Sequence, residues 1–366
     1  MNVGIIGNNL TSLALAKALV NKKVKVTLFY KTQLKSFKTN RCIGITSKNL
    51  DFFNKRVLKI DKNFFNCVNE IGIYFENNIK KEALNFKKNN FSLINIIKIE
   101  KLFSILELKL KENKYFKKKK INKKSFYESI INDNKYNLIL NCEKNNNLVK
   151  KYFYQNFKKD YKSEAITFNL THKKITNNKA VQIFTKNGPL AFLPLSDVQT
   201  SVVFSMYLKK KKYSNKEILK IINSYNKNYL IYKTSSLEKA RLNFFSSRKY
   251  RLGKILLFGD ILHQIHPLAG QGFNMTLRDL EILLQIFQKK IELGLNLDET
   301  ILEEFEKKAK HYNFIYSSSI NFLQDFFRFD SETKNKFSSK IFKLIGKNKF
   351  VNNFFTKIAD RGININ

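Results

Sequence analysis

The sequence predicts an α/β protein in which a parallel sheet is joined to a second, antiparallel sheet. Near the N-terminus, an apolar segment, a turn, a helical pattern and another apolar segment follow one another within about 30 residues, which is the order of a βαβ unit with parallel strands. Between residues 162 and 208, short apolar runs such as "EAITFNL" and "SVVFSMYL" alternate with polar breaks, which is typical of antiparallel strands. Two sheets of different character therefore share one chain.

Each predicted element follows from its pattern of apolar residues. Residues 2–7 and 24–29 are short apolar strands, and residues 11–21 between them repeat apolar side chains at helical intervals. Residues 135–142 and 254–259 are predicted to be further buried strands. The remaining predicted elements are helices at 271–293 and 299–328 and a Lys- and Phe-rich helical tail that extends to residue 366.

The composition allows a large core and carries a strong positive charge. The 366 residues suffice for one large or two ordinary domains, and 43% of them are hydrophobic. Lys and Arg number 68 against 29 Asp and Glu, a net charge of +39. The excess is mostly Lys, is spread from end to end and accompanies abundant Asn, Ile and Phe, which indicates a compositional bias rather than a nucleic-acid surface. The charge would still attract the protein to anionic lipid head groups.

The cysteines and histidines give no sign of a metal site. Cys42, Cys67 and Cys142 lie far apart and form no C-x-x-C pair, which fits a reducing cytoplasm. His263 and His266 are three residues apart, but no further ligand falls at a useful spacing. The N-terminus lacks the features of a signal peptide, and no segment is long and apolar enough to span a membrane. We therefore expect a cytoplasmic protein.

The turn after the first strand is a weak dinucleotide signal. A dinucleotide site favours G-x-G-x-x-G here, because glycines let the backbone approach a pyrophosphate. The chain has Gly7, followed by Asn9 and Ser12 at the other two positions. Asn tolerates left-handed dihedrals and Ser is small, so the turn can survive. An acid is expected after the second strand to hold ribose hydroxyls, but Tyr30 is there. This unit is equally compatible with an α/β fold that binds no nucleotide.

A more specific signal follows the predicted strand at 254–259. Gly259 and Asp260 stand at the carboxyl end of this strand, where open α/β sheets bind ligands. Pro267 stiffens the next loop, and Gly270 to Asn274 form a compact turn that opens a helix. The free N–H groups and positive dipole end of that helix would stabilise a flat ring that gains negative charge.

The stretch "GDILHQIHPLAGQGFNMTLRDLE" resembles the second flavin motif of the FAD-dependent aromatic hydroxylases, in particular their ubiquinone-biosynthesis branch, which shows G-D-x-x-H-x-x-H-P-x-A-G-Q-G-x-N. "TNRCIGITSKNLDFF" resembles the family's segment around an arginine, here Arg41, and "YKSEAITFNLTH" and "AVQIFTKNGPLAFLPLSD" resemble its substrate-domain strands. The resemblance covers residues 1 to about 290 and is looser beyond them.

This resemblance implies a glutathione-reductase-like, Rossmann-type FAD domain interleaved with a β-sheet substrate domain, followed by C-terminal helices. The expected bounds are 1–70, 93–158 and 250–297 for the FAD domain, 71–92 and 159–249 for the substrate domain, and 298–366 for the helices. The implied activity is hydroxylation of a prenylated phenol or quinone precursor of ubiquinone, with FAD, NAD(P)H and O2, through a flavin C4a-hydroperoxide. The ring position, the prenyl length and the choice of NADH or NADPH stay open.

The resemblance also implies the cofactor contacts. Asp260 would contact the ribityl or pyrophosphate part of FAD, Arg41 the nucleotide side, and the loop from Pro267 to Asn274 the isoalloxazine ring. The predicted cofactor-binding residues are Gly7, Asn9, Ser12, Arg41, Gly259, Asp260, Pro267, Gly270, Gln271, Gly272, Phe273 and Asn274. No side chain is assigned a catalytic role.

Three departures from the family pattern leave a second interpretation open. They are the incomplete glycine turn, Tyr30 in place of the ribose acid, and Glu143-Lys144 where the family has an Asp-Gly motif. All three concern the nucleotide side of the cofactor site. The alternative is a flavin-poor or non-catalytic family member that acts as a scaffold in an assembly of ubiquinone-biosynthesis enzymes.

The C-terminal tail suggests a route to a membrane-bound substrate. Between Phe337 and Lys357, Phe, Ile and Leu recur at roughly helical intervals among many Lys residues. A basic amphipathic helix of this kind can lie in the interface of an anionic membrane, here the inner membrane. The same apolar face could equally pack on the protein's own core.

Overall fold

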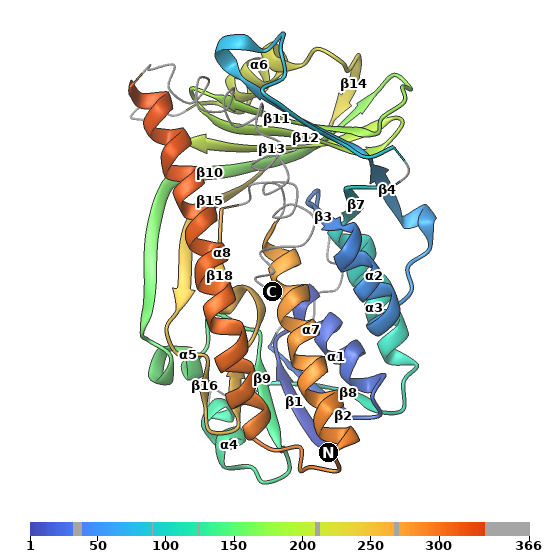
Figure 1. The fold of residues 1–366 in the computed structure, drawn as a ribbon, viewed down its shortest axis with the longest axis vertical. Coiled ribbons are helices and arrows are strands. Elements are labelled where there is room, and N and C mark those ends of the chain that lie inside the picture. Colours follow the sequence, from blue (N-terminus) through green and yellow to red (C-terminus); the bar gives the residue numbers. More distant parts are fainter. Residues whose placement is uncertain (32–38, 90, 123–124, 209–212, 267–270, 334–366) are drawn as a thin grey trace.

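The computed structural model describes residues 1–31, 39–89, 91–122, 125–208, 213–266 and 271–333. Within these ranges the chain forms three sheets, with the nine-stranded one across the upper end of the view in Figure 1 and the six-stranded one at the opposite end. The long helix α8 (Thr300–Thr333) runs along one side of the molecule, from the six-stranded sheet to the nine-stranded one.

The six-stranded sheet contains the predicted βαβ unit. Its order is β16 (Arg251–Leu252), β17 (Ile255–Leu257), β9 (Leu138–Asn141), β1 (Asn2–Ile6), β2 (Lys25–Tyr30) and β8 (Phe116–Lys120). The strands from β17 to β8 are parallel, and only β16 is antiparallel to its neighbour. The central strands are apolar and buried, as expected of a parallel sheet covered on both faces. The outer strand β8 reads "FKKKK", and such lysines disfavour pairing with another sheet edge.

Helices cover this sheet, and shorter helices occur elsewhere in the chain. The helix α1 (Leu10–Val20) connects β1 with β2 and is buried along nearly its whole length. It packs against α3 (Ile99–Lys111) and α7 (Gln271–Glu292). The other helices are α2 (Ser47–Arg56), α4 (Phe126–Asn132), α5 (Asn147–Tyr152) and α6 (Asn215–Tyr225).

The nine-stranded sheet confirms the antiparallel pattern predicted for residues 162–208. Its order is β18 (His263–Gln264), β15 (Glu238–Ser247), β10 (Asn156–His172), β13 (Gln199–Tyr207), β12 (Gly188–Ser196), β11 (Lys179–Thr185), β5 (Glu70–Phe75) and β6 (Leu84–Lys87), with β14 (Ile231–Thr234) beside β10. All neighbours are antiparallel except β11 and β5. A small third sheet of β3 (Cys42–Thr46), β7 (Ile94–Lys98) and β4 (Phe65–Val68) was not predicted.

The sheets exchange strands at the predicted domain bounds. The long strand β10 begins at Asn156, inside the segment expected to end the FAD domain, and β18 joins the nine-stranded sheet from within the last FAD segment. The predicted helical tail from residue 334 onward lies outside the described residues, as do Pro267 and Gly270. Among the residues that are described, no helix combines the length and the apolar character needed to cross a membrane.

Candidate cofactor site

The carboxyl ends of three neighbouring parallel strands lie side by side in the six-stranded sheet, and we call this row of strand ends the edge of the candidate site. The order β17, β9, β1 places Gly259, Glu143 and Gly7 just beyond adjacent strand ends. Backbone bonds hold this edge: the N–H of Cys142 donates to Ile6 O at 2.8 Å, and that of Phe258 to Asn141 O at 2.9 Å. Residues far apart in the sequence thus meet where open α/β sheets bind ligands.

Gly7 and Gly259 are both required by the backbone. Gly7 has φ +120°, and a Cβ there would lie 3.3 Å from the carbonyl carbon of Cys142. Gly259 has φ +79°, and its Cβ would lie 2.5 Å from Cγ2 of Thr11. The segment after β17 therefore approaches the first turn of α1 so closely that only glycine fits.

Asn9 and Ser12, at the positions of the missing glycines, form a capping box at the start of α1. The Ser12 N–H donates to Asn9 Oδ1 at 2.9 Å, and the Asn9 N–H donates to Ser12 Oγ at 2.9 Å. The Asn9 Nδ2 group also donates to the carbonyl of Cys142 at 2.8 Å, which ties the turn to β9. The turn is preserved, but Asn9 and Ser12 carry side chains where the family motif has glycine.

The first turn of α1 keeps some capacity for an anion. The capping box takes the N–H of Ser12, and the N–H of Leu13 bonds Asn9 O at 3.1 Å. For the N–H groups of Leu10 and Thr11, no hydrogen-bond partner lies among the described residues. Two donors at the positive end of the helix dipole thus stay available to a phosphate.

Lys31 directly follows the end of β2, where Tyr30 stands in place of the expected acid. Lys31 Nζ lies 3.4 Å from Glu143 Oε1, and the Tyr127 hydroxyl donates to Glu143 Oε2 at 3.0 Å. Lys31 also lies over the Tyr127 ring, 4.9 Å from its centroid. Burial, together with the Glu143 charge, raises the pKa of Tyr127, so its hydroxyl keeps its proton. Lys31 and Tyr127, which sequence reasoning missed, hold Glu143 near the strand end.

Asp260 and Lys144 complete the strand-end edge. Asp260 is exposed, and the charge on its carboxylate acts on Lys144. Lys144 Nζ donates to Gln264 Oε1 and lies over the Phe245 ring, 4.6 Å from its centroid. Burial lowers the pKa of Lys144 despite the opposing effect of Asp260. The edge therefore has one exposed carboxylate with a cation near it.

The predicted residues at the start of α7 divide into one open position and three packed ones. Among the described residues, a Cβ on Gly272 would meet nothing within 4 Å, so they leave space beside the backbone there. Phe273 is buried, and Gln271 Oε1 accepts a hydrogen bond of 2.6 Å from the Tyr316 hydroxyl. Asn274 accepts from Thr46 N at 3.0 Å and donates to Gly44 O at 2.7 Å. Its side chain therefore fastens α7 to β3.

Arg41 is exposed at the start of β3. The preceding residues are anchored to the other large sheet: Thr39 Oγ1 donates to Glu238 Oε2 at 2.8 Å, and the Asn40 N–H donates to Glu238 Oε1 at 2.5 Å. Glu238 lies at the first residue of β15 and was not predicted. No local pattern marks it, because its partners lie far away in the sequence.

The two histidines of the motif differ in their partners. His263 Nε2 lies 2.6 Å from Asp279 Oδ2, which also accepts from Asn313 Nδ2 at 3.2 Å. His266 is fully buried, with its ring edge-on to Tyr161 at 5.2 Å between centroids. Burial lowers the pKa of His266 to about 3. The neutral ring offers one donor and one acceptor. Within the described ranges, no three His, Cys, Asp or Glu residues gather closely enough to hold a metal.

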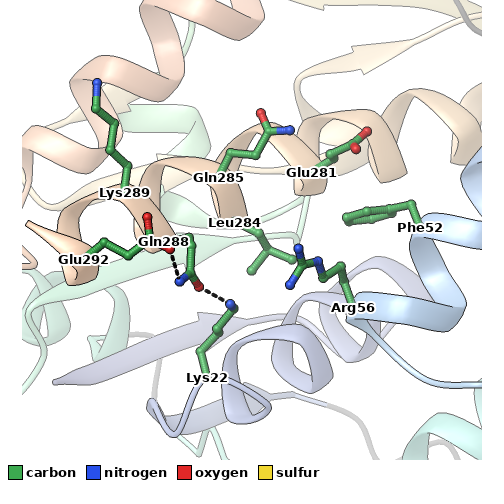
Figure 2. A pocket seen from close by; sticks show the side chains of 9 residues that line it. All are labelled: Lys22, Phe52, Arg56, Glu281, Leu284, Gln285, Gln288, Lys289 and Glu292. Carbon is green, nitrogen blue, oxygen red and sulfur yellow. Dashed lines mark hydrogen bonds between the residues drawn. The ribbon is translucent and has the colours of Figure 1, made fainter.

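A cavity of about 210 Å³ lies elsewhere, between α1, α2 and α7 (Figure 2). Its wall includes Lys22, just after α1, together with Arg56 and Glu281. Because Lys22 follows the carboxyl end of α1, this cavity lies at the other end of that helix from Gly7. None of the predicted cofactor residues lines it, so it is not the candidate site.

These observations test whether the residues fit FAD. The positive φ of Gly7 and Gly259, the two N–H groups on α1 and the open side of Gly272 fit a dinucleotide with a flat ring system. The Lys31–Glu143 pair departs from the expected ribose acid. The backbone cradle thus fits the cofactor, while the side chains at its nucleotide end differ from the family pattern.

Comparisons with known proteins agree with this fold. A family model described as an FAD binding domain matches residues 153–309. Among solved structures, p-nitrophenol 4-monooxygenase from Pseudomonas putida DLL-E4 is similar with a TM-score of 0.77, 11% identity and 98% of each chain covered. HpxO from Klebsiella pneumoniae, in complex with FAD and uric acid, has a TM-score of 0.73 and 11% identity and covers 98% of this chain and 97% of its own. The fold is that of the FAD-dependent monooxygenases.

Curated relatives point to one branch of that class. The chain is 27% identical to the mitochondrial ubiquinone biosynthesis monooxygenase of Xenopus tropicalis, over 51% of this chain and 49% of the relative. It is 27% identical to 3-demethoxyubiquinol 3-hydroxylase of Escherichia coli K12, over 38% of this chain and 37% of the relative. Each of these matches spans about half of the relative's length or less. The chain is thus related to the FAD-dependent aromatic hydroxylases, and within them it resembles the ubiquinone-biosynthesis branch, as its flavin motif predicted.

Proposed function

We propose that this protein is an FAD-dependent monooxygenase that hydroxylates a prenylated phenol or quinone precursor of ubiquinone, with NAD(P)H and O2 as co-substrates. The observation that carries the proposal is the meeting of Gly7, Gly259 and the first turn of α1 at one sheet edge. This edge offers a close backbone approach and two available N–H groups, which suit a pyrophosphate. The relatives' names supply the substrate class, and bound FAD would supply the redox chemistry.

The chain's own residues would bind and orient the cofactor. The N–H groups of Leu10 and Thr11 would face the pyrophosphate, and the exposed Asp260 would accept hydrogen bonds from ribityl hydroxyls. The open side of Gly272 would leave room for the isoalloxazine edge near the start of α7. Asn274 would act indirectly, because its hydrogen bonds to β3 and α2 hold the first turn of α7 in place.

The first test is whether the protein binds FAD. Oxidised flavins absorb near 450 nm, so the purified protein, with or without added FAD, should be yellow. A protein that stays colourless after incubation with FAD contradicts the proposal. The second test is complementation of bacterial strains that each lack one ring hydroxylase, with quinone intermediates identified by mass spectrometry. The wild type should restore one hydroxylation, and Asp260→Ala should not.

The side chains at the nucleotide edge favour a second candidate, a flavin-poor scaffold in an assembly of ubiquinone-biosynthesis enzymes. Lys31, Glu143 and Tyr127 bond one another at the strand ends, where the family's ribose acid is absent. Losing buried polar contacts to a ligand weakens its binding by about 1–3 kcal/mol each. A scaffold would retain its partner enzymes in affinity purification even as Asp260→Ala. An enzyme would lose quinone hydroxylation in the same variant.

A prenylated substrate also requires access to a bilayer, so we propose peripheral association with the cytoplasmic face of the inner membrane. The net charge of +39 supports this, because each Lys near an anionic surface contributes about 1 kcal/mol or less. The predicted amphipathic tail at 337–357 lies outside the described residues.

A further inference from the structure

Three buried polar side chains near the candidate cofactor site have atoms without partners. Both ring nitrogens of His266, both side-chain polar atoms of Gln324 and the hydroxyl of Ser163 are buried, and none has a hydrogen-bond partner among the residues that the structure describes. The three side chains are at most 1% exposed. Leaving such groups unpaired costs about 1–3 kcal/mol each, so native proteins nearly always pair them with protein, water or ligand.

These side chains come from three separate elements that meet at one place. On α8, Tyr316, Ile320, Gln324 and Arg328 recur every four residues and so share one face. Tyr316 and Ile320 pack with Ile265, the neighbour of His266. One turn beyond Gln324, Arg328 Nη1 donates to Tyr161 O at 2.9 Å. Gln324 therefore lies on α8 between Ile320, which packs with Ile265, and Arg328, which bonds Tyr161.

Ser163, on β10, and His266, just after β18, approach the region around Gln324 from the side opposite α8. The burial of β10 alternates between Tyr161, which is buried, Lys162, which is exposed, and Ser163, which is buried. A β-bulge interrupts β10 between Asp160 and Ser163, with Lys162 at φ +49°, but Ser163 shares a face with Ala165, and Ala165 packs in one cluster with Tyr161. The His266 ring lies edge-on to Tyr161 at 5.2 Å. Tyr161 belongs to an apolar cluster that Phe244 contacts, and Phe244 also contacts the cluster around Ile265.

The chemistry of this group favours an oxygen-bearing aromatic ligand. A neutral imidazole, a primary amide and a hydroxyl together offer several donors and several acceptors but no charge. The surrounding side chains are aromatic and aliphatic. The charged side chain beside them, Arg328, already bonds the Tyr161 carbonyl, and a flat ring with hydroxyl and methoxy groups matches both the polar atoms and the apolar walls.

We propose that Ser163, His266 and Gln324 hydrogen-bond the ring oxygens of a phenol or quinol substrate. This inference rests on the proposed hydroxylase function and adds the residues that position the ring. His266 directly precedes the motif expected to pack on the flavin, so the bound ring would lie beside that cofactor segment.

The test uses two small probes, 2-methoxyphenol and toluene, which share a ring but differ in oxygens. Equilibrium dialysis with the full-length protein, with and without FAD, measures both affinities. The wild type should prefer 2-methoxyphenol. Gln324→Leu and Ser163→Ala should each weaken 2-methoxyphenol about tenfold and change toluene less than about twofold, because one buried hydrogen bond is lost. Ser317→Ala, on the same helix and equally buried, should change neither affinity.

A stability measurement separates a binding role from a structural one. Gln324→Leu removes unpaired polar atoms from an apolar setting, so the unliganded variant should be at least as stable to urea as the wild type. The inference is overturned if the wild type binds both probes equally, or if Gln324→Leu and Ser163→Ala leave the affinity ratio unchanged. If the protein binds FAD and restores hydroxylation in that case, the proposed function stands without it. If it binds no FAD, the proposed function itself falls.

Discussion

Gly259 illustrates how a single residue controls the cofactor edge. In Gly259→Ala, an L-residue would take φ +79°, at about 1–2 kcal/mol, and its Cβ would press on Thr11 Cγ2. We expect the free energy of unfolding in urea to fall by about 2 kcal/mol or more and FAD binding to weaken. Adding Thr11→Ser removes the clashing methyl group and should restore part of the loss. An unchanged unfolding free energy in Gly259→Ala would contradict the close approach.

The Asn9 side chain permits a direct test of the altered glycine turn. Asn9→Gly restores the second glycine of the family motif but removes the bonds to Ser12 N and Cys142 O. We expect stability to fall by about 1 kcal/mol, mainly through the lost bond to β9, and FAD to bind more tightly because the backbone is uncovered. Ser12→Ala is the control, since it disturbs the same capping box without opening the turn. Weaker FAD binding in Asn9→Gly would show that Asn9 itself contacts the cofactor.

His266 should make the protein sensitive to mild acid. Its pKa is about 3 in the folded protein against about 6.5 in the unfolded chain, so between these values the unfolded state binds the extra proton. Its contribution to stability is complete above pH 6.5 and decreases as the pH falls. From pH 7.5 to 5 the wild type should lose about 2 kcal/mol more than His266→Leu in urea unfolding. Parallel curves for the two proteins would contradict the burial of a neutral ring.

Among single residues, the sequence predicted those whose type is forced by the backbone. Gly7 was predicted from the glycine turn after the first strand and Gly259 from the Gly-Asp pair of the flavin motif, and both have the positive φ that favours glycine. Glu238, Lys31 and Gln324 were not, because their significance depends on partners that only the fold brings near. Asn274 was predicted as a cofactor residue on its motif position alone, and its hydrogen bonds to β3 could not be read from that position.

At the level of elements, the junction between α7 and β3 is a polar one. Asn274 is buried and bonds Thr46 N, Asn49 Nδ2 and Gly44 O. Asn274→Ala would leave these groups unpaired in the interior, so we expect the free energy of unfolding to fall by about 2–4 kcal/mol. Gln285→Ala, at an exposed position on the same helix, is the matched control and should change it little. Equal stabilities of the two variants would show that water replaces the amide.

The elements themselves were largely predictable, and their pairing was not. Short apolar runs and helical patterns located β1, α1, β2, β9, β17, α7 and α8 within a few residues. The three-stranded sheet of β3, β7 and β4 was missed because its strands are short and pair over long distances. The extension of β10 to Asn156 was missed for a similar reason, since "NFKKD" is polar and pairs with β15 through its backbone.

For the whole molecule, the net charge of +39 predicts adsorption to anionic membranes. The protein should float with vesicles containing anionic lipid at low salt and be released at high salt, because added ions screen exposed charges. Removal of residues 334–366 should reduce flotation while thermal unfolding shows that the remainder is still folded. If the full-length protein stays at the bottom of the gradient at low salt, a carrier or soluble partner must deliver the substrate.

The strand order of the six-stranded sheet also determines when the protein can fold during synthesis. Its strand β9 is flanked by β1, which is made first, and by β17, which follows the long insertion that contains β10 to β15. One side of β9 therefore stays unpaired until β17, and with it most of the chain, has left the ribosome. Loops of this length close slowly, and an apolar edge exposed meanwhile can pair with other chains. Newly made protein should thus depend on chaperones more than its final stability suggests.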